Sequence, residues 1–244
     1  MEDKKILIIH PLDKTTQFLN RIKNHLFKNF KNKIHVFNIQ RTETSHEQCL
    51  QKIRDHSAKG LIIFLGHGRS DKLFGSKGDN YNAIVDEEIQ LEHPQDYYYK
   101  QDFITPENAD VFKDKKVFCL ACNSNEKIAK CAIEKGARSF VGFGDIPTSY
   151  DEFMDKNQNV HNSIVPKIKA ELVYIIKKGL DLAIQNNCTL KELESYIDFI
   201  TSQHIAYILA DGEKFADRYK LADNLYFIKK SIAIFGSSSI PIIE

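Results

Sequence analysis

Short apolar runs alternate with amphipathic segments along the first 145 residues of the chain. The runs are brief and rich in branched aliphatic residues, which is typical of buried strands. The segments between them repeat apolar residues every three or four positions, which is typical of helices. The pattern predicts strands at 5–10, 33–39, 61–65, 116–121 and 139–144, and a further one at 231–236. The helices predicted between the first five strands cover residues 15–30, 45–56 and 125–136.

Strands that are apolar on both faces and separated by helices form parallel sheets that are covered on both sides. The sequence therefore predicts an α/β three-layer sandwich, in which helices cover both faces of a mostly parallel sheet of about six strands. Beyond residue 150 the pattern turns helical, with long segments at 162–184 and 189–209. No repeat, low-complexity tract or Pro/Gly-rich linker divides the 244 residues, so we expect a single domain over 1–244.

Composition and charge indicate an ordinary globular protein. The chain is 42% hydrophobic and 27% charged, and its 34 basic residues nearly balance its 33 acidic ones. This balance gives no signal for nucleic acid or for a membrane surface. The apolar runs are far shorter than the ~20 residues that span a bilayer, and no signal peptide opens the chain. We therefore expect a cytoplasmic protein with reduced thiols.

Two predicted strands end in residues that can carry chemistry. In "LIIFLGHG" (61–68), His67 follows the strand between glycines that let the backbone turn sharply. In "KVFCLACNSN" (116–125), Cys122 stands where the apolar run gives way to a polar loop. Catalytic groups gather at the carboxyl ends of parallel strands, so neighbouring strands would bring His67 and Cys122 together as base and nucleophile. Taken singly, each has a plainer interpretation, as a hydrogen-bonded turn histidine and a core cysteine.

The surroundings of Cys122 suit a nucleophile. A thiolate attacks, and a free cysteine with a pKa of about 8.5 is mostly protonated at neutral pH. The imidazole and the positive end of the helix predicted from Asn125 would both stabilise the thiolate. The backbone N–H groups of Gly68 and Cys122 are the expected oxyanion donors. Cys119 lies inside the strand and is expected in the core. Cys119 and Cys122 form a Cys-x-x-Cys motif. A zinc site needs about four ligands and no second cysteine pair is present, so no metal is expected.

Together, "IIFLGHG", "VFCLACNS" and "IAKCAIEKGARSFVGFGDIP" resemble the caspase-like fold of clan CD cysteine peptidases, and most closely its CHAT branch, which is related to separase. The likeness covers roughly residues 60–147. It implies a caspase-like sandwich and an intracellular cysteine endopeptidase with a His67–Cys122 dyad and no metal or organic cofactor. It also implies protein substrates, allows for a regulatory or activating protein, and suggests a role in regulated cell death or antiviral defence.

The resemblance does not extend to the caspase signature. Ala121-Cys122-Asn123-Ser124 stands in place of Gln-Ala-Cys-Arg-Gly, and Ser237 follows Gly236 where the family often has Gly-Asp-Pro. Aspartate specificity is therefore not implied.

Two acidic residues are candidates for substrate binding. Asp145 follows the fifth strand, where separase- and clostripain-like enzymes place an acidic residue in the pocket for P1, the residue before the cleaved bond. Asp13 follows the first strand and can line the same pocket, so both are expected to hold a P1 Arg or Lys. Alternatively, Asp145 is an exposed loop residue and Asp13 caps the helix at Thr15. Residues 71–114 hold 11 acidic and 4 basic residues, either as negative charge near the pocket or as a solvated loop.

Two other function classes stay open. The first is a catalytically silent member of the same fold that acts as a scaffold or binding module, although the intact His67 and Cys122 argue against it. The second is a nucleotide-binding α/β protein of flavodoxin-like shape. That class needs a glycine-rich phosphate loop after the first strand, and "HPLDKTT" (10–16) contains no glycine.

Overall fold

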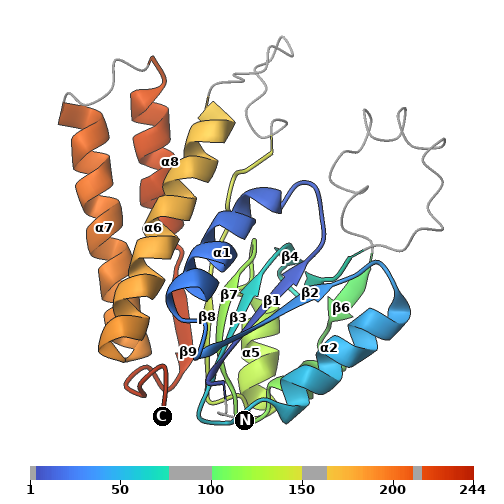
Figure 1. Cartoon of the computed structure of the whole chain (residues 1–244). Coiled ribbons are helices and arrows are strands. Elements are labelled where there is room, and N and C mark those ends of the chain that lie inside the picture. Colours follow the sequence, from blue (N-terminus) through green and yellow to red (C-terminus); the bar gives the residue numbers. More distant parts are fainter. Residues whose placement is uncertain (1–3, 77–100, 150–163, 211–215) are drawn as a thin grey trace, which may run out of the picture.

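A six-stranded sheet runs through the centre of the computed structural model, which describes residues 4–76, 101–149, 164–210 and 216–244 (Figure 1). Its strand order is β2-β1-β3-β7-β8-β9. The strands are β1 (Ile6–Pro11), β2 (Ile34–Ile39), β3 (Leu61–Leu65), β7 (Lys116–Leu120), β8 (Ser139–Gly142) and β9 (Ala233–Gly236). The first five run parallel, and β9 is antiparallel to β8 at one edge. All six predicted strands are confirmed.

Helices cover both faces of this sheet (Figure 1). On one face, the sheet shares a hydrophobic core with α1 (Asn20–Asn29), α6 (Ile164–Asn186), α7 (Leu190–Ala210) and α8 (Arg218–Lys230), in which α7 packs on α6 and α8. The other face packs against α2 (Glu43–Asp55) and α5 (Lys127–Glu134). The predicted three-layer α/β sandwich is therefore confirmed. No helix within the described ranges combines the length and the apolar character needed to cross a lipid bilayer.

The strands read as continuous apolar runs because both of their faces are buried. Successive strand residues point to opposite sides of a sheet. In β3, Ile63 joins the core under α1 and α6, whereas Ile62 and Phe64 join the core under α2 and α5. In β7, Cys119 is fully buried in the second of these cores, and burial raises the pKa of its thiol. The prediction that Cys119 is a core residue is confirmed.

Several shorter elements were not predicted. A second, three-stranded sheet consists of β4 (Gly68–Arg69), β5 (Lys72–Phe74) and β6 (Asp102–Ile104). The short 3-10 helix η3 (Ala109–Phe112) and the longer helix α8 were also missed, whereas the 3-10 helix η1 (Gln17–Leu19) leads into α1 within the helix predicted at 15–30. Most of the acidic segment 71–114 falls in 77–100, outside the described residues. Because β4 begins immediately after His67, the small sheet sits beside the end of β3 and helps to shape the site.

Candidate active site

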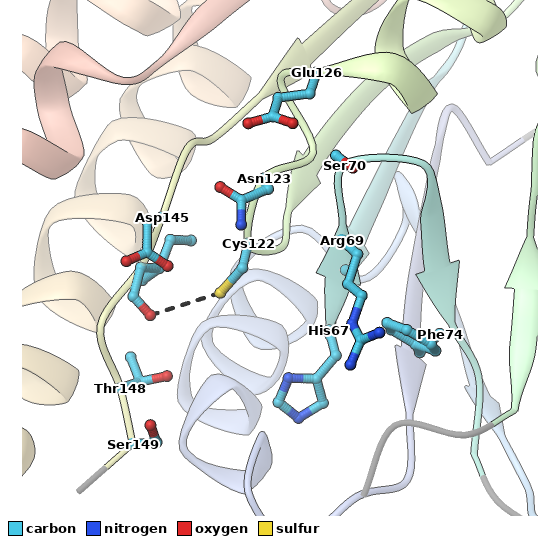
Figure 2. Close-up of a pocket in the computed structure, with 12 residues that line it drawn as sticks. His67, Arg69, Ser70, Phe74, Cys122, Asn123, Glu126, Asp145, Thr148 and Ser149 are labelled. Atoms are coloured by element: carbon cyan, nitrogen blue, oxygen red, sulfur yellow. Dashed lines mark hydrogen bonds between the residues drawn. The ribbon is translucent and has the colours of Figure 1, made fainter. Parts of the chain in front are cut away.

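The carboxyl ends of β3 and β7 hold His67 and Cys122 at equivalent positions. The strands are parallel neighbours whose register pairs Leu65 with Leu120, and each candidate residue lies two positions beyond its strand's paired end. Adjacent strands lie roughly 4.8 Å apart. Both residues line one cavity of about 520 Å³ (Figure 2). The structure thus brings together the two residues that the sequence proposes as base and nucleophile.

A buried serine anchors the loop that carries Cys122. The Ser124 hydroxyl is fully buried, donates to the carbonyl of Cys119 at 3.0 Å and accepts from the N–H of Phe143 at 3.0 Å. It therefore ties the end of β7 to the segment after β8. Between Ser124 and the thiol, Asn123 has a φ of +52°, a left-handed conformation that Asn adopts more readily than most residues. The polar residues after the strand thus turn the backbone sharply at the cysteine.

The Cys122 thiol lies at the edge of the cavity and is half-buried. Its Sγ donates to the carbonyl of Ile146 at 3.6 Å, in the segment after β8 (Figure 2). The following helix begins at Lys127, two residues later than predicted, with Glu126 at its N-cap. The N–H of Ile128 in its first turn donates to the carbonyl of Ser70 at 2.7 Å. The start of α5 therefore meets the β4–β5 turn and carries a carboxylate, which offsets the positive helix end expected near the thiol.

The His67 imidazole is held by the segment that follows β1. Its Nε2 lies 2.6 Å from Oγ1 of Thr15 and 3.4 Å from Oδ1 of Asp13. Burial lowers the pKa of His67, while the contact with Asp13 acts in the opposite direction without cancelling it. The ring is therefore neutral at pH 7 in the unliganded protein, as a general base must be before it accepts a proton.

Asp13 lies on His67 rather than in the cavity with Cys122. It lines a neighbouring cavity of about 460 Å³. Its Oδ1 accepts from the backbone N–H groups of Thr15 at 2.7 Å and Thr16 at 3.3 Å, just before η1. Burial acts to raise the pKa of Asp13, but the hydrogen bonds from His67 and Thr15 outweigh burial and hold that pKa below its usual value. These contacts place the Asp13 carboxylate in the turn before η1 and against His67, outside the cavity that Asp145 lines.

The pairing of β4 with β5 determines the direction of the Gly68 N–H. It lies opposite Leu73 in the β4–β5 pair, and the neighbouring N–H of Phe74 donates to the carbonyl of His67 at 3.1 Å. Gly68 is therefore in a non-hydrogen-bonded pair, and its N–H points away from β5. A Cβ at this position would lie 3.0 Å from the carbonyl oxygen of Cys122. A side chain at this position would require one of the two backbone segments to shift, so glycine suits the close approach.

Charged side chains of both signs line the cavity. Asp145 is exposed and lies on the same side of the cavity as Cys122, whereas Arg69 lies on the side of His67 (Figure 2). Glu126 adds a second carboxylate that the sequence interpretation missed. Its position directly before a helix and four residues after Cys122 is the signal that could have found it. Among the described residues, no group of three or more His, Cys, Asp or Glu side chains could hold a metal ion.

Comparisons with known proteins add little to this geometry. No protein-family model matches the chain, and no curated protein matches it. An alignment covers 96% of this chain and 99% of a crystal structure described as a phosphofructokinase from Staphylococcus aureus, with 11% identity and a TM-score of 0.27. A TM-score this low supports no conclusion about fold or function. The proposals that follow are therefore based on the site and on the motifs of the sequence.

Proposed function

We propose that the chain is a cysteine endopeptidase of the caspase-like type, with Cys122 as nucleophile and His67 as general base. The observation that carries the proposal is the equivalent placement of the two residues beyond adjacent parallel strands, together with the cavity that they share. The motifs around both residues, which resemble the CHAT branch of clan CD peptidases, support the same conclusion. Protein substrates follow from this class of activity.

The reaction proceeds by acyl transfer. The imidazole of His67 removes the proton from Sγ of Cys122, and the sulfur attacks the scissile carbonyl carbon. The tetrahedral oxyanion receives hydrogen bonds from the N–H groups of Gly68 and Cys122. The protonated imidazole then gives its proton to the leaving amine, which leaves a thioester on Cys122. Water, deprotonated by His67, hydrolyses the thioester and restores the thiol.

We further propose that the enzyme prefers a basic P1 residue. Asp145 and Glu126 both line the cavity beside the thiol, and among the described lining residues they outnumber the cations, of which Arg69 is one. A carboxylate that faces a bound Lys or Arg forms a charge-assisted hydrogen bond, whereas an acidic side chain would be repelled. Asp13 takes no part in this preference because its carboxylate lies on His67.

A fluorogenic peptide library, varied at the P1 position, tests the activity and the preference together. We expect hydrolysis that is fastest after Arg and Lys and is lost in Cys122→Ala. The matched control is Cys131→Ala, since Cys131 is also a free, half-buried thiol but lies on α5. No hydrolysis across the library, with Cys122 and Cys131 equally reactive toward a peptidyl thiol probe, would instead support the catalytically silent scaffold.

A further inference from the structure

The contacts of Thr15 determine which nitrogen of His67 carries the proton. A hydroxyl group has a single proton to donate, and an ionised carboxylate can only accept. The Thr15 hydroxyl donates its proton to Oδ1 of Asp13. Its 2.6 Å contact with Nε2 of His67 therefore has the ring N–H as the donor and Oγ1 as the acceptor. Neutral imidazole has one protonated nitrogen, so Nδ1 is the unprotonated one.

The unprotonated nitrogen lies on the nucleophile's side. Of the two ring nitrogens of His67, the one bonded to Thr15 is turned away from Cys122, and the other lies on the side of the thiol (Figure 2). A base must present a lone pair to the proton that it removes. The ring is thus oriented for proton transfer before any substrate arrives.

We propose that Thr15 and Asp13 are positioning residues that hold His67 as the Nε2–H tautomer and present its Nδ1 to Cys122. The proposal rests on the proposed peptidase function and adds two residues to its machinery. Neither residue touches the substrate, and Thr15 was not singled out by the sequence. Asp13, for which the sequence left a pocket residue and a helix cap open, supports the base in this proposal.

The carboxylate of Asp13 is held in place before substrate binds. The Asp13 side chain is 10% exposed, and the backbone N–H groups of Thr15 and Thr16 fix its Oδ1. When His67 accepts the thiol proton, the ring becomes a cation whose Nε2–H points along the hydroxyl of Thr15 to the carboxylate. An ionised carboxylate in this place stabilises the imidazolium ion and maintains the ring orientation.

Among the residues that the structure describes, the other charged or titratable groups near His67 do not replace this role. Lys169 on α6 lowers the pKa of His67, so it works against the imidazolium ion. His10 on β1 donates or accepts through Nδ1 at the carbonyl of Leu65, 2.7 Å away, and burial lowers its pKa to about 4, so it stays neutral. Arg69 and Asp145 line the same cavity as His67 but belong to its substrate side. Asp13 is the carboxylate that raises the pKa of His67.

The tautomer is measurable by nitrogen-15 NMR of the histidine rings in the full chain, without any substrate. We expect His67 of the wild type to be the Nε2–H tautomer when neutral. Asp13→Asn should lower the pKa of His67 and shift the ring toward the Nδ1–H tautomer, because an amide can donate to Nε2. Thr15→Val should lower the population of the Nε2–H tautomer of His67, and Thr15→Ser should restore it. The matched control is Asp110→Asn, an exposed carboxylate on η3, which should leave the His67 signals unchanged.

A second readout follows the thiol itself. Alkylation of Cys122 by iodoacetamide at pH 7 should slow by about tenfold in Asp13→Asn. A tenfold loss corresponds to a rise of about one unit in the pKa of the thiol, because the thiolate is the reactive form. In the peptidase assay the same variant should lose kcat with little change in KM, since Asp13 does not line the substrate cavity. Thr15→Ser should recover most of the rate that Thr15→Val loses, because serine restores the hydroxyl that links Nε2 of His67 to Asp13.

The outcomes separate the two proposals. A wild-type ring in the Nδ1–H tautomer, or unchanged His67 signals and alkylation rates in both Asp13→Asn and Thr15→Val, overturns the positioning role whether or not peptides are cleaved. The expected tautomer and alkylation changes without cleavage of any peptide support the positioning role and contradict the peptidase function. Amide spectra of each variant show whether the fold is kept, and Thr15→Ser provides the test if Asp13→Asn does not fold.

Discussion

Replacing Gly68 by Ala should reduce catalysis far more than it reduces stability. The added Cβ would lie 3.0 Å from the carbonyl oxygen of Cys122, 3.1 Å from Cβ of Ala121 and 3.3 Å from Cδ2 of Leu73. All three contacts are tighter than an ordinary van der Waals contact, so the β4 backbone must move away from the nucleophile loop. Such overpacking typically costs about 1–3 kcal/mol of folding stability.

The catalytic cost follows from the same movement. If the N–H of Gly68 is an oxyanion donor, its displacement removes roughly 2.7–4 kcal/mol of transition-state stabilisation, or about 10²–10³ in kcat. The loss should fall on kcat rather than on KM, because the oxyanion forms only during the reaction.

The assay is the initial rate of hydrolysis of a fluorogenic Arg or Lys peptide, with thermal unfolding measured in parallel. Gly136→Ala is the matched control, since Gly136 has a φ of +97° at the end of α5 and the substitution costs roughly 1–2 kcal/mol of stability. We expect the control to keep its kcat. Wild-type kcat in Gly68→Ala, despite a lowered melting temperature, would remove Gly68 from the oxyanion site.

Three further predictions concern single residues. Cys122→Ala and His67→Ala should each abolish peptide hydrolysis and leave the melting temperature nearly unchanged, whereas Cys119→Ala should lower the melting temperature and keep the activity; the reverse pattern would contradict the site. Asp145→Asn should reduce kcat/KM for Arg and Lys substrates by the equivalent of about 1.5–3 kcal/mol and leave Leu substrates unaffected, and equal losses for all substrates would speak against a charge contact. Burial lowers the pKa of His10 to about 4, so the folded state binds fewer protons at His10 than the unfolded state does. The contribution of His10 to the free energy of unfolding should therefore be complete above roughly pH 6.5 and fall as the pH drops toward 4. Denaturant titrations should show that the free energy of unfolding depends less on pH in His10→Gln.

The central sheet and the placement of His67 and Cys122 at one edge of it were predictable because they depend on short-range patterns and one general rule. The strands are buried on both faces, so each one appears in the sequence as a short apolar run. The strand-end rule then placed His67 and Cys122 at one edge, and the adjacency of β3 and β7 completed the prediction. The sequence analysis took this adjacency as a condition, and the pairing of β3 with β7 in the structure meets that condition.

The missed features lack such patterns. The strands β4, β5 and β6 have only two or three residues each, too few to show a period. The helix α8 buries Leu221, Leu225 and Ile228, but the exposed aromatic rings of Tyr226 and Phe227 obscure its apolar stripe.

The contact of Asp13 with His67 could not be predicted, for a comparable reason. Both interpretations weighed for this residue, a cap and a pocket carboxylate, used only its local sequence. Its contact with His67 joins residues 54 positions apart and depends on β1 lying beside β3. Thr15 was not predicted because a threonine at the start of a helix is common. Its proposed role depends on its hydroxyl group donating to Asp13 and accepting from His67, which the sequence does not show. Long-range contacts of polar side chains are fixed by strand order and loop geometry, which periodicity does not report.

Trapping of the acyl-enzyme tests the central claim most directly. The wild type, Cys122→Ala and Cys131→Ala would each be mixed with an ester of an Arg peptide, quenched in acid within the first turnover, and analysed by intact mass and peptide mapping. The account predicts one acyl group per chain on Cys122 in the wild type and in Cys131→Ala, and none in Cys122→Ala. Acylation of a different residue, or hydrolysis of the ester that persists in Cys122→Ala, would contradict the account.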